Sequence, residues 1–570
     1  MTHAGNGQTV RKEGSRDDDR SVCETVFAYH ERTKHHFQRY ARSLGYLDWA
    51  TQPHPFRYYE GSLQRRLDLN RTPRPLAYDQ LYEHNPLSPK PVDLDSLADF
   101  FRYSLALSAW KQSGSNRWAL RINPSSGNLH PTEAYIVLPS LSGASANPAL
   151  YHYVSESHVL EQRASFPEHV WRNLTHSLPE GSFLVGLSSV IWREAWKYGE
   201  RAFRYCQHDI GHAVAALRFA AVLCGWTFRL VSSWSTEDIA QLLGVNRAGE
   251  FCEEEPEEAE VLAVVTLNTA EAKDWPSLPP PDDTTLQQIR ESDWYGQANQ
   301  LSNSHVPWPV IEEVTTATKM PRTAALVEAS PLDHERSADT RNSSILDARQ
   351  IILQRRSCLS LDGVSTIPRE TFFHMLARTL PASHPPWDAL YWRAKIHLLL
   401  FVHRVVGLRP GVYILVRDLT KTDLLKSAFR AELAWQTLAG VPADLPLYLL
   451  VEGDCREAAR ALSCHQDIAA DSFFSLGMIA EFTDSIQRYG APFYRNLFWE
   501  SGVIGQVLYL EAEAAGARST GIGCFFDDPV HDVLGLKGNQ FQSLYHFTVG
   551  IPVEDHRLQS APPYPEDNPR

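Results

Sequence analysis

Two short segments of this chain carry the residue types that bind a phosphate group and a flat polar ring. Arg355, Arg356 and Ser357 are consecutive, and two guanidinium groups beside a hydroxyl suit a phosphate through charge-assisted, often bidentate hydrogen bonds. The loop PSSGN at residues 124–128 supplies hydroxyls and a side-chain amide just before an apolar, strand-like run. Because Pro, Ser, Gly and Asn also make ordinary turns, the loop alone does not distinguish a ligand-binding loop from a simple turn.

A third segment, STGIGCFFDD at residues 519–528, places two glycines in a strand-like setting. Gly521 and Gly523 would let the backbone approach a flat ring closely and present bare N–H donors to it. A phosphate cluster combined with a ring platform matches flavin mononucleotide (FMN), so we expect FMN binding. Cys524, directly after Gly523, is interpreted as a packing residue rather than a redox residue.

The chain lacks the short motifs of several other cofactor and catalytic sites. No G-x-G-x-x-G, G-x-x-x-x-G-K-[ST], G-x-S-x-G or H-E-x-x-H is present, so Rossmann, P-loop, hydrolase-elbow and zincin sites lack support. HERTKHH at residues 30–36 does not have zincin spacing and is interpreted as a solvated helix face. None of the eight cysteines forms a CxxC pair. We therefore expect no metal site.

Composition limits the class of protein. A chain of 570 residues is too long for one ordinary domain. The net charge of −14 and the pI near 5.9 argue against a nucleic-acid surface. No apolar run is long enough to span a membrane, and the polar N-terminus does not have the pattern of a signal peptide. Because scattered cysteines fit a reducing compartment, we expect a cytoplasmic protein without nucleic-acid or membrane partners.

Changes in composition along the chain indicate two domains of similar size. We expect a disordered N-terminus at residues 1–20, a first domain at 21–270, a linker at 271–344, a second domain at 345–557 and a tail at 558–570. The linker and the tail are polar and rich in proline. CEEEPEEAE at residues 252–260 is interpreted as a solvated acidic loop.

The two domains share a repeat without gaps. The stretch KYGERAFRYCQHDIGHAVAALRFAAVLCGW, which begins at Lys197, aligns with RYGAPFYRNLFWESGVIGQVLYLEAEAAGA, which begins at Arg488. Each stretch predicts a long helix with Gly225 or Gly516 as its C-terminal stop. We interpret the repeat as a tandem duplication that makes the chain a fused dimer; a chance match of two amphipathic helices is the alternative. The coinciding pairs are Tyr198/Tyr489, Gly199/Gly490, Arg204/Arg495, Gly211/Gly502, Leu217/Leu508, Ala221/Ala512 and Gly225/Gly516.

The two copies differ in a complementary way. The first copy has the PSSGN loop but no arginine pair, whereas the second has the arginine–serine cluster and the glycine strand but no such loop. Taken together, these three segments would form one complete site. The equivalent segments, at the matching positions of the other copy, would form almost no site. One bound FMN per chain is therefore expected rather than two.

These segments resemble the FMN-dependent nitroreductase superfamily, and the match is closer to its SagB-type branch, the dehydrogenases that oxidise thiazolines and oxazolines in modified peptides. NPSSGNLHPTEAY, ALYHY at 149–153 and WKYGERAFRYCQHDIGHA at 196–213 carry the resemblance, which covers most of residues 25–270 and 345–553. It implies an α+β fold of two nitroreductase-like domains, each a central, mainly antiparallel sheet flanked by helices. The domains would form an intrachain pseudo-dimer with FMN between them.

The resemblance also implies roles for individual residues. Lys197 and Tyr198 match the catalytic Lys-Tyr pair of the peptide-azoline dehydrogenases, and oxidising a C–H bond needs a base for one proton while a hydride leaves to the flavin. Alternatively, Lys197 is a solvated helix residue and Tyr198 packs in the core. Arg557 either adds to phosphate binding or is an exposed tail arginine. The expected FMN-binding residues are Arg355, Arg356, Ser357, Pro124, Ser125, Ser126, Asn128, Gly521, Gly523 and Arg557.

Three functions remain open at the level of the sequence. The first is FMN-dependent dehydrogenation of a small molecule or a modified peptide, with Lys197 or Tyr198 as the base. The second is reduction of a nitro compound or quinone by NAD(P)H, which could dock directly on the flavin and needs no such base. The third is a flavin-free binding protein that has kept the fold. No peptide-binding partner domain is visible in the chain.

Overall fold

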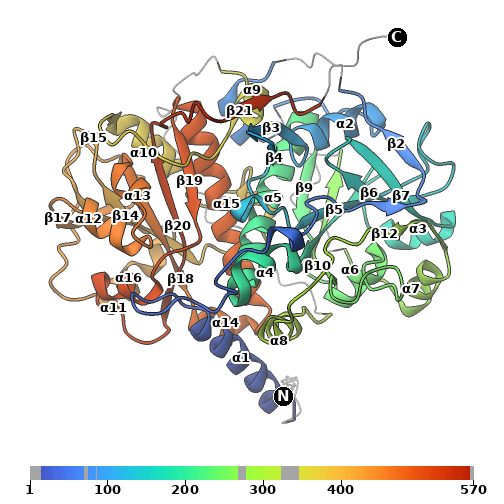
Figure 1. Ribbon diagram of the computed structural model, residues 1–570, viewed down its shortest axis with the longest axis horizontal. Coiled ribbons are helices and arrows are strands. Elements are labelled where there is room, and N and C mark those ends of the chain that lie inside the picture. The colour runs from blue at the N-terminus through green and yellow to red at the C-terminus, as the bar shows by residue number, and fades with distance from the viewer. Residues whose placement is uncertain (1–13, 70–74, 85, 268–277, 323–345, 565–570) are drawn as a thin grey trace, which may run out of the picture.

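Two β-sheets lie on either side of a pair of long central helices (Figure 1). The structure, a computed structural model, describes residues 14–69, 75–84, 86–267, 278–322 and 346–564. We call residues 21–270 the first half of the chain and residues 345–557 the second half. Within the described residues both main sheets are antiparallel and flanked by helices, which confirms the α+β class.

The sheet of the first half has the strand order β11-β7-β6-β5-β8-β10-β9. All neighbouring strands on this path are antiparallel, and β2 pairs with β7 beside it. Strand β5, directly after the PSSGN loop, is buried at every position, as a continuous apolar run predicts. The bounds are β2 Gln64–Arg66, β5 Thr132–Leu138, β6 Ala149–Val154, β7 Val159–Ser165, β8 Phe183–Val190, β9 Thr227–Leu230, β10 Glu257–Thr266 and β11 Asp293–Trp294.

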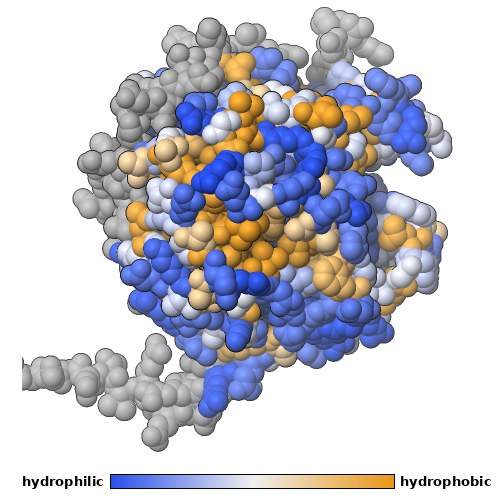
Figure 2. Space-filling view, turned by 90° about the vertical axis from the view of Figure 1, so that its left-hand side faces the viewer, coloured by the Kyte–Doolittle hydropathy of each residue, from blue (hydrophilic) through white to orange (hydrophobic). Residues whose placement is uncertain are grey.

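The sheet of the second half has the order β17-β16-β14-β18-β20-β19, again antiparallel throughout. This order repeats β7-β6-β5-β8-β10-β9 of the first sheet, strand for strand. The edge strand β17 lies on the side of the molecule that faces the viewer in Figure 2, where apolar side chains gather among hydrophilic ones. The bounds are β14 Ile396–Val402, β16 Gly411–Leu415, β17 Leu447–Glu452, β18 Phe474–Glu481, β19 Arg518–Ile522 and β20 Phe541–Gly550.

The repeated stretch forms the central helices α5 (Ala202–Cys224) and α15 (Phe493–Ala514). Every residue of α5 is buried, and its C-terminal part, AVAALRFAAVLC, is mostly apolar or small, as a helix surrounded by other elements requires. Gly225 ends α5 in a left-handed conformation with φ of 70°, as predicted. A side chain at Gly211 would collide with the backbone of Trp499 and Gly502, and one at Gly502 with that of His208 and Gly211. The coinciding glycines of the repeat therefore mark the point where the two helices touch.

Buried ion pairs join the two halves reciprocally. Arg204 on α5 reaches Asp527 of the second half at 2.8 Å, and its counterpart Arg495 on α15 reaches Glu260 of the first half at 2.7 Å. All four side chains are almost fully buried. Removing one partner of such a pair leaves a desolvated charge, so each bridge holds the halves in one arrangement.

Both ends of the described part of the chain contact the opposite half. Helix α1 (Gly14–Arg32) begins inside the stretch expected to be disordered, and His30 contacts Gln542 and Tyr494 of the second half at 3.1 Å. At the other end, β21 (Gln559–Ala561) pairs with β3 (Leu107–Ser113), which also pairs with β4 (Asn116–Arg121). The tail therefore adds a strand to the first half.

Much of the expected linker has regular structure where it is described. Helices α7 (Asp283–Arg290) and α8 (Pro309–Ala317) lie in it, β11 joins the first sheet, and β12 (Gln297–Ala298) pairs with β1 (Tyr59–Glu60). Residues 268–277 and 323–345 of the linker are outside the described residues.

The expectation of a solvated acidic loop at 252–260 was right only in part: Glu253 and Glu254 are exposed. Glu255, Glu257 and Glu260 are buried, because β10 begins at Glu257 and each carboxylate meets hydrogen-bond donors from neighbouring segments.

The remaining elements complete the two layers of helices around the sheets. None of the described helices has both the length and the apolar composition that crossing a bilayer requires. Their bounds are α2 Leu94–Arg102, α3 Glu168–Thr175, α4 Ile191–Tyr198, α6 Thr236–Leu243, α9 Ala348–Gln354, α10 Arg369–Arg378, α11 Thr422–Ala428, α12 Arg456–Leu462, α13 Asp467–Asp471, α14 Thr483–Tyr489 and α16 Asp527–Leu534, with the short parallel strands β13 Ile367–Pro368 and β15 Val405–Val406.

Candidate functional site

A cavity of about 500 Å³ lies between the halves and is lined by both. Its size is within the range of small-molecule and cofactor sites. The cavity brings together every residue expected at the site except Arg557. From the first half these are Pro124, Ser125, Ser126, Asn128, Lys197 and Tyr198, and from the second half Arg355, Arg356, Ser357, Gly521 and Gly523.

The arginines form a desolvated cationic cluster at one wall. Arg355 lies over the ring of Tyr509 at 5.0 Å and donates to the carbonyl of Arg121, while its Nε has no hydrogen-bond partner. Arg356 donates to the carbonyls of Leu353 and Ser108 at 2.8 Å. Burial, together with Arg355 and Arg518, lowers the pKa of Arg356 to about 9. Because the positive charges in this cluster repel one another, binding of an anion is favoured there.

Tyr509 connects this cluster to the glycine strand β19. Its hydroxyl lies 2.9 Å from the hydroxyl of Ser357 and accepts the Gly521 N–H at 3.0 Å. Ser357 also forms a β-bridge with Ser519, the second residue of the strand. The Gly521 N–H is therefore already used, contrary to the expectation that it is bare.

Gly521 on β19 and Gly523 just after this strand have a packing role that the sequence did not indicate. A side chain at Gly521 would collide with the hydroxyl of Tyr545, and one at Gly523 with the ring of Tyr205. Both tyrosines line the cavity. The backbone at these two positions can therefore pack against Tyr545 and Tyr205 only because the glycines lack a Cβ.

The PSSGN loop is held mostly by its own side chains. The Ser125 hydroxyl accepts the His130 N–H at 2.8 Å, and the Asn128 amide donates to the carbonyl of Ala119 at 2.9 Å. Gly127 has φ of 58° and packs against Tyr198, with no room for a Cβ. The loop is therefore a preformed wall of the cavity rather than a set of free polar groups.

Sequence reasoning missed Asp209, a buried carboxylate on α5 that lines the cavity. It accepts the N–H and the hydroxyl of Ser126, each at 3.0 Å. Burial outweighs the hydrogen bonds from the serines and raises the pKa of Asp209 to about 7. The sequence did carry one signal. Asp209, in QHDIGHA, is the acidic residue of a helix whose residues are all buried.

Glu194 on α4 is a second buried carboxyl group near this wall. Neither of its oxygens has a hydrogen-bond partner among the described residues. Burial and the nearby Asp209 raise its pKa well above the usual value, and Lys197 acts against this shift.

Lys197 and Tyr198 form the last turn of α4 and both line the cavity. The ammonium group of Lys197 lies 5.2 Å from the centre of the Tyr198 ring. Burial and Glu194 raise the pKa of Tyr198 well above 10, so Tyr198 is a protonated phenol at neutral pH. The counterparts Arg488 and Tyr489 do not line this cavity.

The structure does not bring Arg557 to the cavity. Its guanidinium is exposed and pairs with Asp555 at 2.7 Å, and the next residue, Leu558, lines the cavity instead.

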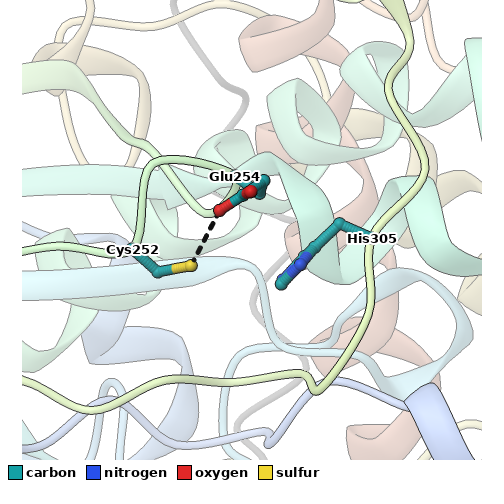
Figure 3. Close-up of side chains that lie close together, drawn as sticks. All are labelled: Cys252, Glu254 and His305. Atoms are coloured by element: carbon teal, nitrogen blue, oxygen red, sulfur yellow. Dashed lines mark hydrogen bonds between the residues drawn. The ribbon is translucent and has the colours of Figure 1, made fainter.

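A separate cluster of possible metal ligands lies on the first half. Cys252, Glu254 and His305 each place one ligand atom within 4.8 Å of the others (Figure 3). However, the Cys252 thiol donates to Glu254 at 3.1 Å, and His305 Nε2 lies 2.8 Å from the buried Glu255. Each group thus has a protein partner, and the contacts tie residue 305 to the segment before β10.

Residues 352–551 match the model of the Nitroreductase family. This region contains the arginine–serine cluster and the glycine strand. The match lies within the second half of the chain. No curated protein matches the chain.

Solved structures share the fold. A protein from Anabaena variabilis, described as a proposed nitroreductase, has a TM-score of 0.64 at 21% identity, covering 93% of this chain and 99% of its own. Partial likenesses include the E. coli microcin synthetase McbBCD complex with truncated pro-MccB17 (17% identity, 35% of this chain, 70% of that chain, TM-score 0.27). Another is the NADPH:FMN oxidoreductase from Vibrio harveyi complexed with NAD⁺ (16%, 36%, 68%, TM-score 0.21). The first similarity shows a nitroreductase fold over almost the whole chain.

Proposed function

We propose that this chain is an FMN-dependent oxidoreductase that binds one FMN in the cavity between its halves and acts as a SagB-type dehydrogenase. The observation that carries the proposal is that segments far apart in the sequence, each suited to one part of FMN, line the same cavity. We also propose that the chain is cytoplasmic and arose by tandem duplication, which the matching strand orders and the contact between Gly211 and Gly502 support.

The residues of the cavity fit FMN in charge and in shape. Arg355 and Arg356 would hold the phosphate, because both are partly or fully desolvated and donate only to backbone carbonyls in the contacts described. The unpartnered Nε of Arg355 is one donor available to an added anion. The PSSGN loop and the glycine strand would enclose the ring, and Tyr205 and Tyr545 lie behind the strand.

Bound FMN would supply an acceptor for a hydride. The proton that a dehydrogenation releases must then go to a group of the protein. Asp209 can accept it, because its pKa of about 7 leaves a large fraction ionised at neutral pH. Lys197 lies on the same cavity as a second proton-binding group, and Tyr198, which keeps its phenol proton, can donate a hydrogen bond to the substrate.

These titratable groups favour dehydrogenation over the second candidate, reduction of a nitro compound or quinone by NAD(P)H. Hydride transfer from NAD(P)H needs no protein base. Dehydrogenation does need one, and the cavity that contains Asp209, Lys197 and Tyr198 offers groups that can accept a proton or donate a hydrogen bond. We propose a small molecule or a modified peptide with a ring C–H bond as the substrate class.

The first test is the flavin content of the purified chain. We expect one FMN per chain, measured from the visible spectrum after heat release. Two FMN per chain would contradict the single shared cavity. No binding even with added FMN would favour a flavin-free binding protein. With FMN bound, oxidation of NAD(P)H coupled to a nitro compound or quinone, without any dehydrogenation of azoline-containing peptides, would favour the second candidate.

A further inference from the structure

Two cysteines meet at the rim of the cavity. Cys464 lies between α12 and α13, and Cys524 lies two residues after the end of β19, so the fold brings together two positions that are far apart in the sequence. Their sulfur atoms are 2.8 Å apart, with the Cys524 thiol donating to Cys464. Both residues are only partly buried, and Cys524 lines the cavity. The pair is therefore accessible and faces the site where redox chemistry is proposed.

The surroundings distinguish the two sulfurs. Arg201 donates to the carbonyl of Gly523 at 3.1 Å, which places a guanidinium beside Cys524. The contact with Cys464, aided by Arg201, lowers the pKa of Cys524 despite burial, whereas the same contact raises the pKa of Cys464. Thiolates, not thiols, are nucleophiles. Cys524 is accordingly the nucleophilic sulfur, and Cys464 is in place to react second.

The other cysteines provide a contrast. Cys206, Cys224 and Cys455 are buried, and burial raises the pKa of each. Cys358 lines the same cavity as Cys524, but its neighbour is the Thr520 hydroxyl rather than a second thiol, and burial raises its pKa. Cys358 is therefore a matched control for Cys524.

We propose that Cys464 and Cys524 form a redox-active dithiol that exchanges with low-molecular-weight disulfides and thiols at the cavity rim. The Cys524 thiolate attacks one sulfur of a disulfide RSSR, a mixed disulfide forms, and RS⁻ leaves. Cys464 then gives up its proton and attacks the sulfur of Cys524, which forms the internal disulfide and releases the second RS⁻. Two protons end on two RSH, and two electrons pass from the chain to the disulfide. This site goes beyond the proposed dehydrogenation and does not depend on FMN.

The experiment exposes the native chain to glutathione disulfide, with and without added FMN, followed by alkylation and peptide mass mapping. We expect the chain to lose two of its eight thiols, with one disulfide joining the peptides that contain Cys464 and Cys524. Dithiothreitol should reverse the change. Because the map is read on the natural chain, the result does not require any variant to fold.

Two variants sharpen the test. Cys464→Ser should leave glutathione attached to Cys524, because the second sulfur is missing, and Cys358→Ser should still lose two thiols. Cys524 should react about tenfold or more faster than Cys358. The proposal is overturned if all eight thiols of the natural chain survive, if a glutathione adduct on Cys524 persists in it, or if Cys358 reacts as fast. Internal disulfide formation without flavin binding would leave this proposal intact while removing the proposed function.

Discussion

At the scale of single residues, Arg355 and Arg356 decide whether the cavity can hold a phosphate. Neither guanidinium has a carboxylate among the hydrogen-bond partners described, and the pKa of Arg356 is lowered by burial and by its cationic neighbours. An anion would relieve this repulsion. These side chains are therefore in place for a ligand that brings its own charge.

We expect Arg356→Ala to weaken FMN binding without unfolding the chain. Loss of a charge-assisted hydrogen bond costs about 1.5–3 kcal/mol, which is roughly a 10- to 150-fold rise in Kd. Ser126→Trp should also weaken binding by filling the cavity. Arg488→Ala is the control, because its residue occupies the repeat-related position on the exposed surface away from the cavity. Fluorescence titration with FMN measures all three, and equal losses would contradict a single shared site.

The pH dependence of turnover should identify Asp209 as the proton acceptor. If the carboxylate is the base, kcat/KM for dehydrogenation rises with pH and levels off above about 7, the pKa to which burial raises this group. Asp209→Asn should remove the rising limb and most of the activity. A rising limb that persists in Asp209→Asn would transfer the role to Lys197.

Thermal unfolding separates this effect from a change in stability. Because the folded pKa of Asp209 lies above its ordinary value of 3.8, its contribution to stability is fully present at low pH and is lost as the pH rises through about 7. Asp209→Asn should remove that part of the decline in Tm between pH 4 and 7. A variant that loses activity but keeps its Tm at pH 8 therefore has a chemical defect.

At the scale of elements, the contact between α5 and α15 depends on two glycines. A methyl group at Gly502 would meet the His208 carbonyl and the Gly211 backbone, and backbone cannot move as a flexible side chain can. We expect Gly502→Ala to destabilise the chain by about 3 kcal/mol or more, at or above the upper end of overpacking costs. Denaturant unfolding measures the loss. Ser501→Ala, on the same helix, removes a hydroxyl that donates to the Leu497 carbonyl one turn earlier and should cost about 1 kcal/mol; equal losses would contradict the close contact.

The sequence allowed some of these elements to be predicted and not others. Glycine positions and apolar periodicity predicted α5, α15 and their register, because both signals are local. The burial of Glu255, Glu257 and Glu260 was not predictable, since it depends on donors supplied by residues far away in the chain. The position of Asp209 was not predictable for the same reason, because its partner Ser126 lies 83 residues earlier in the chain.

The cavity residues were predicted more successfully than their contacts. Types and spacing identified the arginine cluster and the PSSGN loop, and the structure places them on one cavity. The sequence indicated that Gly521 and Gly523 allow a close approach of the backbone. It did not indicate that the groups approached are Tyr545 and Tyr205. Packing partners of this kind are set by tertiary structure, which residue spacing alone does not reveal.

At the scale of the whole molecule, the halves are interlocked. Helix α1 lies against Gln542 and Tyr494, β21 pairs with β3, and buried ion pairs that include Arg204–Asp527 and Arg495–Glu260 cross between the halves. All these contacts are independent of the covalent connection between residues 322 and 346. The connection should therefore matter for assembly more than for holding the finished structure together.

Cleavage of that connection tests the point. With a protease site inserted between residues 323 and 345, we expect the cut chain to elute as one particle in size-exclusion chromatography and to keep its bound FMN, because both halves line the cavity. Arg204→Ala should weaken the cut complex, since Asp527 would keep only Arg201 as a buried cationic partner, and loss of a charge-assisted hydrogen bond costs about 1.5–3 kcal/mol. The uncut Arg204→Ala chain should resist dissociation better, because its halves cannot diffuse apart. Separation of the natural halves on cleavage would show that the connection itself, rather than the interlocked elements, maintains the shared cavity.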